Sequence, residues 1–527
     1  MSKSDLITLN EASRWASDYT NKKIYPSNIN YLLQYSIIDK INNEGIIYIS
    51  KSELKKYYDK NKIEKKWKEK LGDDLNWNLS FDNLREIDTT KHVHRLHPYK
   101  GKFIPQLVDY FLNSNTDDFK KEIYFHKNDI ILDPFCGSGT TLVQANELNI
   151  NAIGIDISHF NTMISNCKID DIDLEKLEFV LKDITSKFQE YIISYKIFEF
   201  ENELNNILNT FNEINFPNIE YKKNIRNKKI NHNIYGNEKE KEFLNTYNYL
   251  IKKYNIDLHN KKEDTFIYKW YIPNIVNELK FVSDLINKIE NKKINNIAKI
   301  ILSRTMRSCR ATTHSDLGTL LKPVNYTYYC KKHYKICKPL FSINKWWKVY
   351  SSDTIKRLKK FKELRTDTYQ ICLTGDARNM NIFENIKYLF EDKHFYKLLN
   401  KQKISGIFTS PPYIGLIDYH EQHAYAYDLF KIDRNDNLEI GSLSKGQSST
   451  AKQSYIEDIA KVLNNAKKYM KDNYNVFIVA NDKYDLYPQI AELSGMKIVN
   501  RFKRPVLNRV EKDKSAYSET IFHLKEL

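Results

Sequence analysis

The stretch Asp133-Pro-Phe-Cys-Gly-Ser-Gly-Thr-Thr141 follows a short apolar run and decides the fold. The run itself, Asp129-Ile-Ile-Leu-Asp133, predicts a strand, and Thr140 through Leu148 predict a helix. A second strand is predicted at Asn151-Ala-Ile-Gly-Ile-Asp156. A strand, a glycine-rich turn, a helix and a second strand in about 28 residues indicate the start of a parallel, doubly wound α/β sheet.

Acidic residues stand at the ends of the first three predicted strands. Asp133 opens the glycine turn, Asp156 ends the second strand, and Asp376 ends a third strand segment at residues 368–376. Gly137 and Gly139 let a cofactor approach the backbone where a Cβ would collide, and the amide groups of the turn can bind a carboxylate. A carboxylate at Asp156 can accept hydrogen bonds from both hydroxyls of a ribose. Three acids would repel phosphates, so the pattern favours S-adenosylmethionine over a phosphate-rich nucleotide.

A second motif, Thr409-Ser-Pro-Pro-Tyr413, follows another predicted strand at residues 404–409. Parallel strands end at one edge of a sheet, so this loop is expected beside the cofactor. The exocyclic amine of cytosine or adenine is a poor nucleophile because its lone pair is delocalised into the ring. The Ser410 side chain and the Pro411 carbonyl would accept hydrogen bonds from the amine, while Pro411 and Pro412 keep the loop rigid. Tyr413 would stack on a base rotated out of the duplex.

Together the two motifs resemble those of the amino-group DNA methyltransferases of bacterial restriction-modification systems, over residues 92–160 and 368–527. The resemblance implies an α/β fold with a Rossmann-like sheet of the S-adenosylmethionine-dependent methyltransferase type. It also implies a glycine loop on the methionine side of the cofactor, Asp156 on the ribose and Asp376 facing the adenine. The cofactor-binding residues expected on this basis are Phe103, Ile104, Asp133, Phe135, Gly137, Gly139, Thr140, Asp156 and Asp376.

The target atom is indicated by Ser410, the residue that precedes the two prolines of the second motif. In the family that the chain resembles, Ser at this position goes mostly with N4 of cytosine, and Asp or Asn goes mostly with N6 of adenine. Ser410 therefore favours N4-cytosine methylation, with N6-adenine methylation as the alternative. An RNA base as substrate and a non-catalytic DNA-binding regulator are further alternatives. Methylation at C5 of cytosine needs a Cys nucleophile, usually in a Pro-Cys pair, and the chain contains no Pro-Cys dipeptide.

Five segments are expected along the chain. They are a helix-turn-helix-like unit at 1–60, a linker at 61–90, the first part of the methyltransferase domain with the cofactor loop at 91–160, an inserted helical target-recognition domain at 161–366, and the second part with the catalytic loop at 367–527. In the second part, residues 497–500 and 519–524 predict a closing antiparallel strand pair.

The N-terminal unit is similar to the winged helix-turn-helix of excisionase-like DNA binders. Residues 9–16 predict a helix capped by Asn10, Pro26 a turn before a second helix, and residues 45–50 a strand followed by a third helix. A helical cap that makes no DNA contact is the alternative interpretation.

The insertion is the expected reader of the DNA sequence. Apolar residues spaced by three and four predict a helix with one buried face, namely Ile275, Leu279, Val282, Ile286 and Ile289. Arg304, Arg307 and Arg310 are spaced three apart and are expected to reach phosphates or guanine edges from a helix, unless they form a solvated basic face. Tyr419, beyond the catalytic loop, is expected to contact the target base or the DNA.

A metal is not expected from the sequence. Cys330, His333 and Cys337 have metal-binding side chains, and Cys309 or His314 could complete a set of four. The spacing lacks a Cys-x-x-Cys pair, so no structural zinc is predicted, and the proposed chemistry needs no metal.

Composition indicates the partner. The 83 Lys and Arg residues exceed the 67 Asp and Glu residues, which gives a net charge of +16 and favours double-stranded DNA. A separately encoded restriction endonuclease is a further expected partner. No run of 18 apolar residues occurs, the N-terminus has no apolar signal core, and the six cysteines fit a reducing compartment. We therefore expect no membrane contact and a place in the bacterial cytoplasm.

Overall fold

Seven strands form the central sheet of the computed structural model, in the order β11-β12-β10-β9-β4-β5-β8. The structure describes residues 5–34, 38–43, 46–60, 63–82, 84–193, 197–262, 264–316, 320–389, 394–507 and 516–527. The strands are β4 (Ile130–Asp133), β5 (Asn151–Asp156), β8 (Gln370–Thr374), β9 (Ile404–Thr409), β10 (Met470–Ala480), β11 (Met496–Pro505) and β12 (Ser518–Glu526). The predicted α/β class and the predicted closing antiparallel pair, β11 and β12, are confirmed.

The two sequence motifs leave the sheet side by side. β4 pairs in parallel with β9, with Leu132 opposite Ile407, although the two strands are far apart in the chain. β5 pairs in parallel with the other edge of β4, with Asp133 opposite Gly154. The loops that follow β4, β5 and β9 therefore start from one edge of the sheet, as the motifs predict.

Helices cover both faces of the sheet because successive strand residues point to opposite sides. Ile131 enters a core shared with α6 (Pro105–Leu112), α7 (Thr140–Glu147) and α8 (His159–Ile169). Ile130 and Leu132 enter a second core, which lies on the other face of the sheet. The helices around this second core are α17 (Ile382–Leu389), α18 (His394–Gln402), α20 (Ser449–Lys467) and α21 (Tyr487–Leu493).

The helices of the insertion lie between β5 and β8. They are α9 (Leu174–Ile193), α10 (Ile197–Asn215), α11 (Asn218–Arg226), α12 (His232–Tyr254), α13 (Phe266–Trp270), α14 (Pro273–Asn287), α15 (Lys292–Cys309) and α16 (Asn344–Lys362). The helix predicted from the apolar spacing is α14, which ends before Ile289.

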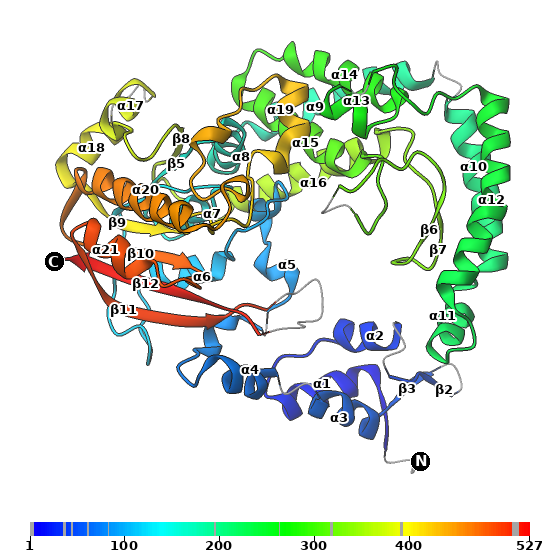
Figure 1. Ribbon diagram of the computed structural model, residues 1–527, viewed down its shortest axis with the longest axis horizontal. Coiled ribbons are helices and arrows are strands. Elements are labelled where there is room, and N and C mark those ends of the chain that lie inside the picture. The colour runs from blue at the N-terminus through cyan, green and yellow to red at the C-terminus, as the bar shows by residue number, and fades with distance from the viewer. Residues whose placement is uncertain are drawn as a thin grey trace.

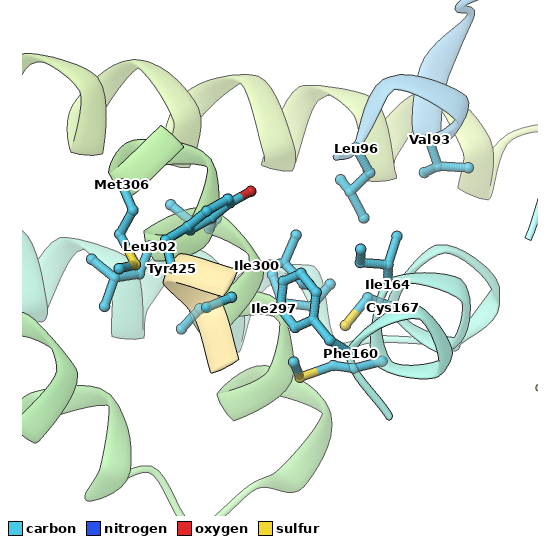
Figure 2. Packing of buried hydrophobic residues seen from close by; sticks show 14 of the residues in the cluster. Val93, Leu96, Phe160, Ile164, Cys167, Ile297, Ile300, Leu302, Met306 and Tyr425 are labelled. Carbon is cyan, nitrogen blue, oxygen red and sulfur yellow. The ribbon is translucent and has the colours of Figure 1, made fainter. Parts of the chain in front are cut away.

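The insertion shares the first core with the sheet. Figure 2 shows Phe160 and Ile164 of α8 beside Ile297 and Ile300 of α15. Tyr425 of α19 (Ala424–Phe430) belongs to the same buried cluster. The base of the insertion is therefore continuous with the sheet, and only its far helices extend away from it.

The N-terminal unit has its own small core, built around Ala12, Ile29 and Leu32. Its elements are β1 (Leu6–Thr8), α1 (Leu9–Thr20), α2 (Pro26–Gln34), β2 (Ile41–Asn43), β3 (Ile46–Ser50) and α3 (Lys51–Lys60). The predicted order of two helices, a strand and a third helix is found, and its role in DNA binding stays a prediction.

Two local predictions in this unit are wrong. Thr8 rather than Asn10 caps α1, because Thr8 and Glu11 form a capping box in which the Glu11 carboxylate accepts from the Thr8 amide at 2.8 Å. Pro26 does not form a turn but is the first residue of α2, where its missing N–H carries no penalty.

The expected linker is folded. Residues 63–89 include α4 (Ile63–Leu71), a 3-10 helix at Trp77–Ser80 and α5 (Glu86–Thr89). Trp67 and Trp77 lie edge to face and pack with Leu507, which anchors the segment near the end of β11. Two tryptophans and Leu75 form the buried part of this small core, so the segment folds without the apolar periodicity that a longer amphipathic helix would show.

The described chain forms a ring in Figure 1. From the sheet the insertion crosses to α10 and α12, which lead down to α11 near β2 of the N-terminal unit. Arg226 of α11 forms an ion pair with Asp39 at 2.7 Å, and both side chains are exposed. Among the described residues, no helix combines the length and apolar character that a membrane span requires.

Candidate active site

One cavity lies where the two motif loops and their neighbours meet. Most of the residues predicted for the cofactor and the catalytic loop line it, namely Phe103, Phe135, Gly137, Thr140, Asp156, Asp376, Ser410 and Pro412. Tyr419, which is predicted to contact the target base or the DNA, lines it as well. The remaining predicted residues of these two groups are described by the structure but lie outside this lining, namely Ile104, Asp133, Gly139, Pro411 and Tyr413. The residues predicted from the two motifs therefore gather around one site, where some line the cavity and others lie behind its lining.

Asp156 is the acceptor at the centre of the cofactor loop. Its carboxylate accepts hydrogen bonds from the amides of Gly137 and Ser158, each at 2.8 Å, and from the side chain of Asn161 at 3.1 Å. Burial raises the pKa of Asp156 to about 6, against the opposing effect of these hydrogen bonds. The end of β5 thus presents a carboxyl group that titrates near neutral pH to the cavity.

The two glycines of the turn are required for different structural reasons. Both adopt left-handed backbone conformations, with φ of 52° at Gly137 and 74° at Gly139. A Cβ on Gly137 would come within 3.0 Å of the Tyr99 hydroxyl, on the cavity side. A Cβ on Gly139 would come within 3.0 Å of Ser165 and 3.1 Å of its Cα. Gly139 therefore allows α8 to pack against the turn. It is predicted to bind the cofactor, but it does not line the cavity.

Asp133 connects the two motif loops through hydrogen bonds to its side chain. Its side chain is buried, and its Oδ1 accepts from the Thr409 hydroxyl at 2.6 Å and from the Phe135 amide at 3.2 Å. Burial raises the pKa of Asp133 to about 6. Asp133 thus ties the start of the catalytic loop to the cofactor loop, and its predicted role at the cofactor stays a prediction.

Asp376 lines the cavity but already has a cationic partner. Arg378 donates to both carboxylate oxygens of Asp376, at 2.7 to 3.0 Å, and also reaches Asp458 at 3.0 Å. Burial alone would raise the pKa of Asp376, but the bonds from Arg378 outweigh it and lower the value. The carboxylate is therefore held ionised, with its remaining lone pairs available to a donor.

The catalytic loop is anchored by two hydrogen bonds at the C-terminal side of its proline pair. The Tyr455 hydroxyl donates to the Pro412 carbonyl at 3.0 Å, and the Tyr413 hydroxyl donates to Glu519 of β12 at 2.7 Å. Burial raises the pKa of Tyr413 well above its usual value, and the Glu519 carboxylate adds to the shift. Ser410 lines the cavity, whereas Tyr413 lies outside its lining, so the contact expected between Tyr413 and a base is not prearranged.

Several residues that line the cavity lie outside the predicted set, among them Tyr99, Asn161 and Glu439. Tyr99 lines the cavity and stacks on Tyr419 at 6.0 Å between ring centroids. Asn161 holds Asp156, and Glu439 accepts from the His420 amide at 2.8 Å as well as pairing with its ring. Tyr99 lies within the His- and Lys-rich segment before the glycine loop, and Asn161 lies in the first turn of α8, shortly after Asp156. Glu439 has no sequence signal, because it enters the site from a distant loop.

The arginines of the insertion do not form one exposed face. Arg304 is buried, pairs with Asp353 at 2.6 Å and lies over the ring of Tyr350. Arg310 is also buried, lies just past the end of α15 and faces the ring of Tyr425. Both guanidinium groups are turned inward by these contacts, and a DNA contact by either arginine stays a prediction. Arg307 alone of the three is partly exposed.

Comparisons with known proteins agree with the geometry. A family model described as DNA methylase, of the N6 and N4 methyltransferase class, matches residues 15–166. The type II methyltransferase M.MjaII of Methanocaldococcus jannaschii is 45% identical over 526 residues, which cover 99% of this chain and 97% of that protein.

Two further relatives match a shorter part of the chain. The type II methyltransferase M.MvaI of Kocuria varians is 32% identical over 127 residues, 24% of this chain and 27% of its own length. The type II methyltransferase M.BsoBI of Geobacillus stearothermophilus is 33% identical over 125 residues, 23% of each chain.

Proposed function

Since the chain belongs to the amino-group DNA methyltransferase family of restriction-modification systems, we propose that it methylates N4 of a cytosine within a specific DNA sequence, with S-adenosylmethionine as the methyl donor. The observation that carries this proposal is the shared cavity. Ser410 of the catalytic loop and Asp156 of the cofactor loop line one space, although they lie 254 positions apart in the sequence.

The cavity fits the proposed cofactor. Within the described residues, Ser138 Oγ and Asn161 Oδ1 are buried and have no hydrogen-bond partner, and both residues line the cavity. Buried polar atoms are rarely left unsatisfied, so a ligand with hydroxyl and amine groups suits them. Asp156 would hold the ribose, and Phe103 and Phe135 would contact the apolar part. When bound, S-adenosylmethionine supplies a methyl group on a positively charged sulfur.

The protein's part in the reaction is to position the amine. Ser410 Oγ and the Pro411 carbonyl would accept the two N–H bonds of the cytosine amine, which aims its lone pair at the methyl group. The anchors on Pro412 and Tyr413 hold the loop for this purpose. The amine itself attacks, so no covalent enzyme intermediate is needed.

Tyr419 is the better placed aromatic residue for the base. It lines the cavity and stacks on Tyr99, whereas Tyr413 is engaged with Glu519. A base rotated out of the duplex would meet Tyr419 on entering the cavity, and Tyr413 would support the loop from behind.

The assignment to cytosine rests on Ser410. We further propose that the insertion and the N-terminal unit contact the DNA, that Arg307 is the arginine of the α15 set that does so, and that a separate endonuclease recognises the same sequence. The test is nucleoside mass spectrometry with modification mapping on DNA from cells that express the chain. N4-methylcytosine in one short sequence context is the expected product.

Other products would separate the alternatives. N6-methyladenine would keep the mechanism and overturn the reading of Ser410. Modification of RNA alone, or of no nucleic acid despite DNA binding, would overturn the proposed DNA methylation. A control chain with Ser410→Ala excludes methylation by enzymes of the host.

A further inference from the structure

Four metal-binding side chains converge in the insertion, away from the active site. His314, Cys330, His333 and Cys337 each offer one ligand atom, and these atoms all lie within 4.8 Å of one another. None of the four residues lines the cavity described above. Two thiols and two imidazoles form the donor set that tetrahedral zinc takes in structural sites.

The spacing of the ligand atoms matches a tetrahedron. Zn–S bonds of about 2.3 Å and Zn–N bonds of about 2.1 Å place neighbouring ligand atoms roughly 3.6 Å apart. Cys330 Sγ lies 3.7 Å from His314 Nδ1, and Cys337 Sγ lies 3.8 Å from His333 Nδ1. In these two pairs the ligand atoms already stand about one tetrahedral edge apart, and all four lie within 4.8 Å of one another, so a zinc ion fits between them with little movement.

The hairpin that carries the two cysteines has only a small core of its own, although Tyr329 and Ile336 reach the main core. Cys330 and Cys337 lie in a hairpin of two three-residue strands, β6 (Tyr328–Cys330) and β7 (Lys335–Cys337). A two-stranded hairpin is marginal by itself. The small buried cluster beside it contains Val324, Tyr328 and the two cysteines, so half of its members are thiol side chains.

We propose that this chain binds a structural zinc ion through His314, Cys330, His333 and Cys337. The site is closed, because four protein ligands complete a tetrahedron and leave no position for water or substrate. Of the two residues that the sequence offers as the fourth ligand, His314 and Cys309, it is His314 that lies with the other three. Cys309 is buried within α15 and belongs to the main core.

The ion ties together segments that meet the rest of the insertion. His314 follows α15, and the hairpin is fastened to the long helices through Asn212 of α10, which exchanges two hydrogen bonds with Ile336 at 2.9 and 3.0 Å. The Tyr329 amide donates to Glu240 of α12 at 2.8 Å. Zinc therefore fixes the direction in which α10 and α12 leave the core.

The test is the metal content of the full chain. Protein purified without an immobilised-metal column is expected to contain about one zinc ion per molecule by plasma mass spectrometry. Replacement by Co²⁺ is expected to give the visible absorption of tetrahedral cobalt together with thiolate charge-transfer bands. Cys337→Ala should lose most of the bound metal, while the matched variant Cys309→Ala keeps it.

Three outcomes would overturn the proposal. They are a wild-type chain that neither contains zinc nor takes up added Zn²⁺ or Co²⁺, equal zinc in Cys337→Ala and wild type, and a Cys330–Cys337 disulfide in the freshly isolated protein. The cobalt spectrum uses the native chain, so the test still decides if Cys337→Ala does not fold. No arm depends on methylation, so failure here is distinguishable from failure of the proposed function.

Discussion

At the scale of single residues, the carboxyl group of Asp156 gives the site a dependence on pH. Its pKa of about 6 means that it is ionised above that pH and protonated below it. The ionised form is the stronger acceptor of hydrogen bonds from two ribose hydroxyls, so cofactor affinity should fall as the pH falls through about 6. Calorimetric titration with S-adenosylmethionine from about pH 5 to about pH 8, a range that brackets the pKa of Asp156, would measure the change in affinity.

The matched variant is Asp156→Asn. It should bind the cofactor at least about tenfold more weakly at the upper end of the range and lose most of the pH dependence. Because burial raises the pKa of Asp156, the ionised group destabilises the cofactor-free fold above about pH 6. The variant should therefore melt no lower than the wild type there, and unchanged affinity in the variant would contradict the role.

Replacement of Ser410 should slow the chemical step and leave cofactor binding nearly unchanged. Ser410→Ala removes a hydrogen-bond acceptor from the cavity and should lower kcat on the order of 100-fold, with cofactor affinity nearly unchanged. The control is Ser494→Ala, which removes a buried hydroxyl that bonds only within its own turn, at the Ala491 carbonyl. Single-turnover kinetics would show the loss, and wild-type rates in Ser410→Ala would contradict the assignment.

At the scale of elements, the turn between β4 and α7 requires Gly139 for two reasons. Its φ of 74° strains any other residue, and a Cβ would press on Ser165 of α8. Gly495 also has a positive φ, 62°, but a Cβ there would meet only the end of the flexible Lys467 side chain, at 3.0 Å. Gly139→Ala should therefore lower the unfolding free energy by about 1 to 3 kcal/mol more than Gly495→Ala. Denaturant unfolding would compare the two, and equal losses would exclude the packing contribution.

Elements were predictable from the sequence where the signal is local. The strand before Asp133, the glycine turn and the strand before Ser410 each depend on a few adjacent residues, and the structure contains all three. Partners brought together by the fold were not predictable. Asp353 turns Arg304 inward, and Glu439 reaches His420 from a separate loop. The spacing of the Cys and His residues in the hairpin was not enough to predict a metal site, because His314 comes close to them only in the folded chain.

At the scale of the whole molecule, the net charge of +16 governs the encounter with DNA. Positive side chains that neutralise phosphates release counterions, so affinity for a duplex should fall at least about tenfold between low and physiological salt. Fluorescence anisotropy with a labelled duplex over a salt series would measure the slope. Cofactor binding to the same protein serves as the control and should change far less. A salt-independent duplex affinity would exclude a charge-driven interface.

The order of strands also bears on how the protein is made. β4 lies between β5, which follows it closely, and β9, which emerges from the ribosome about 270 residues later. At synthesis rates of about 5 to 20 residues per second, that edge of β4 waits roughly 15 to 50 seconds for its neighbour. An unpaired strand edge can join a strand of another chain. The nascent polypeptide is therefore most prone to aggregate while the insertion is being translated, before the sheet can close.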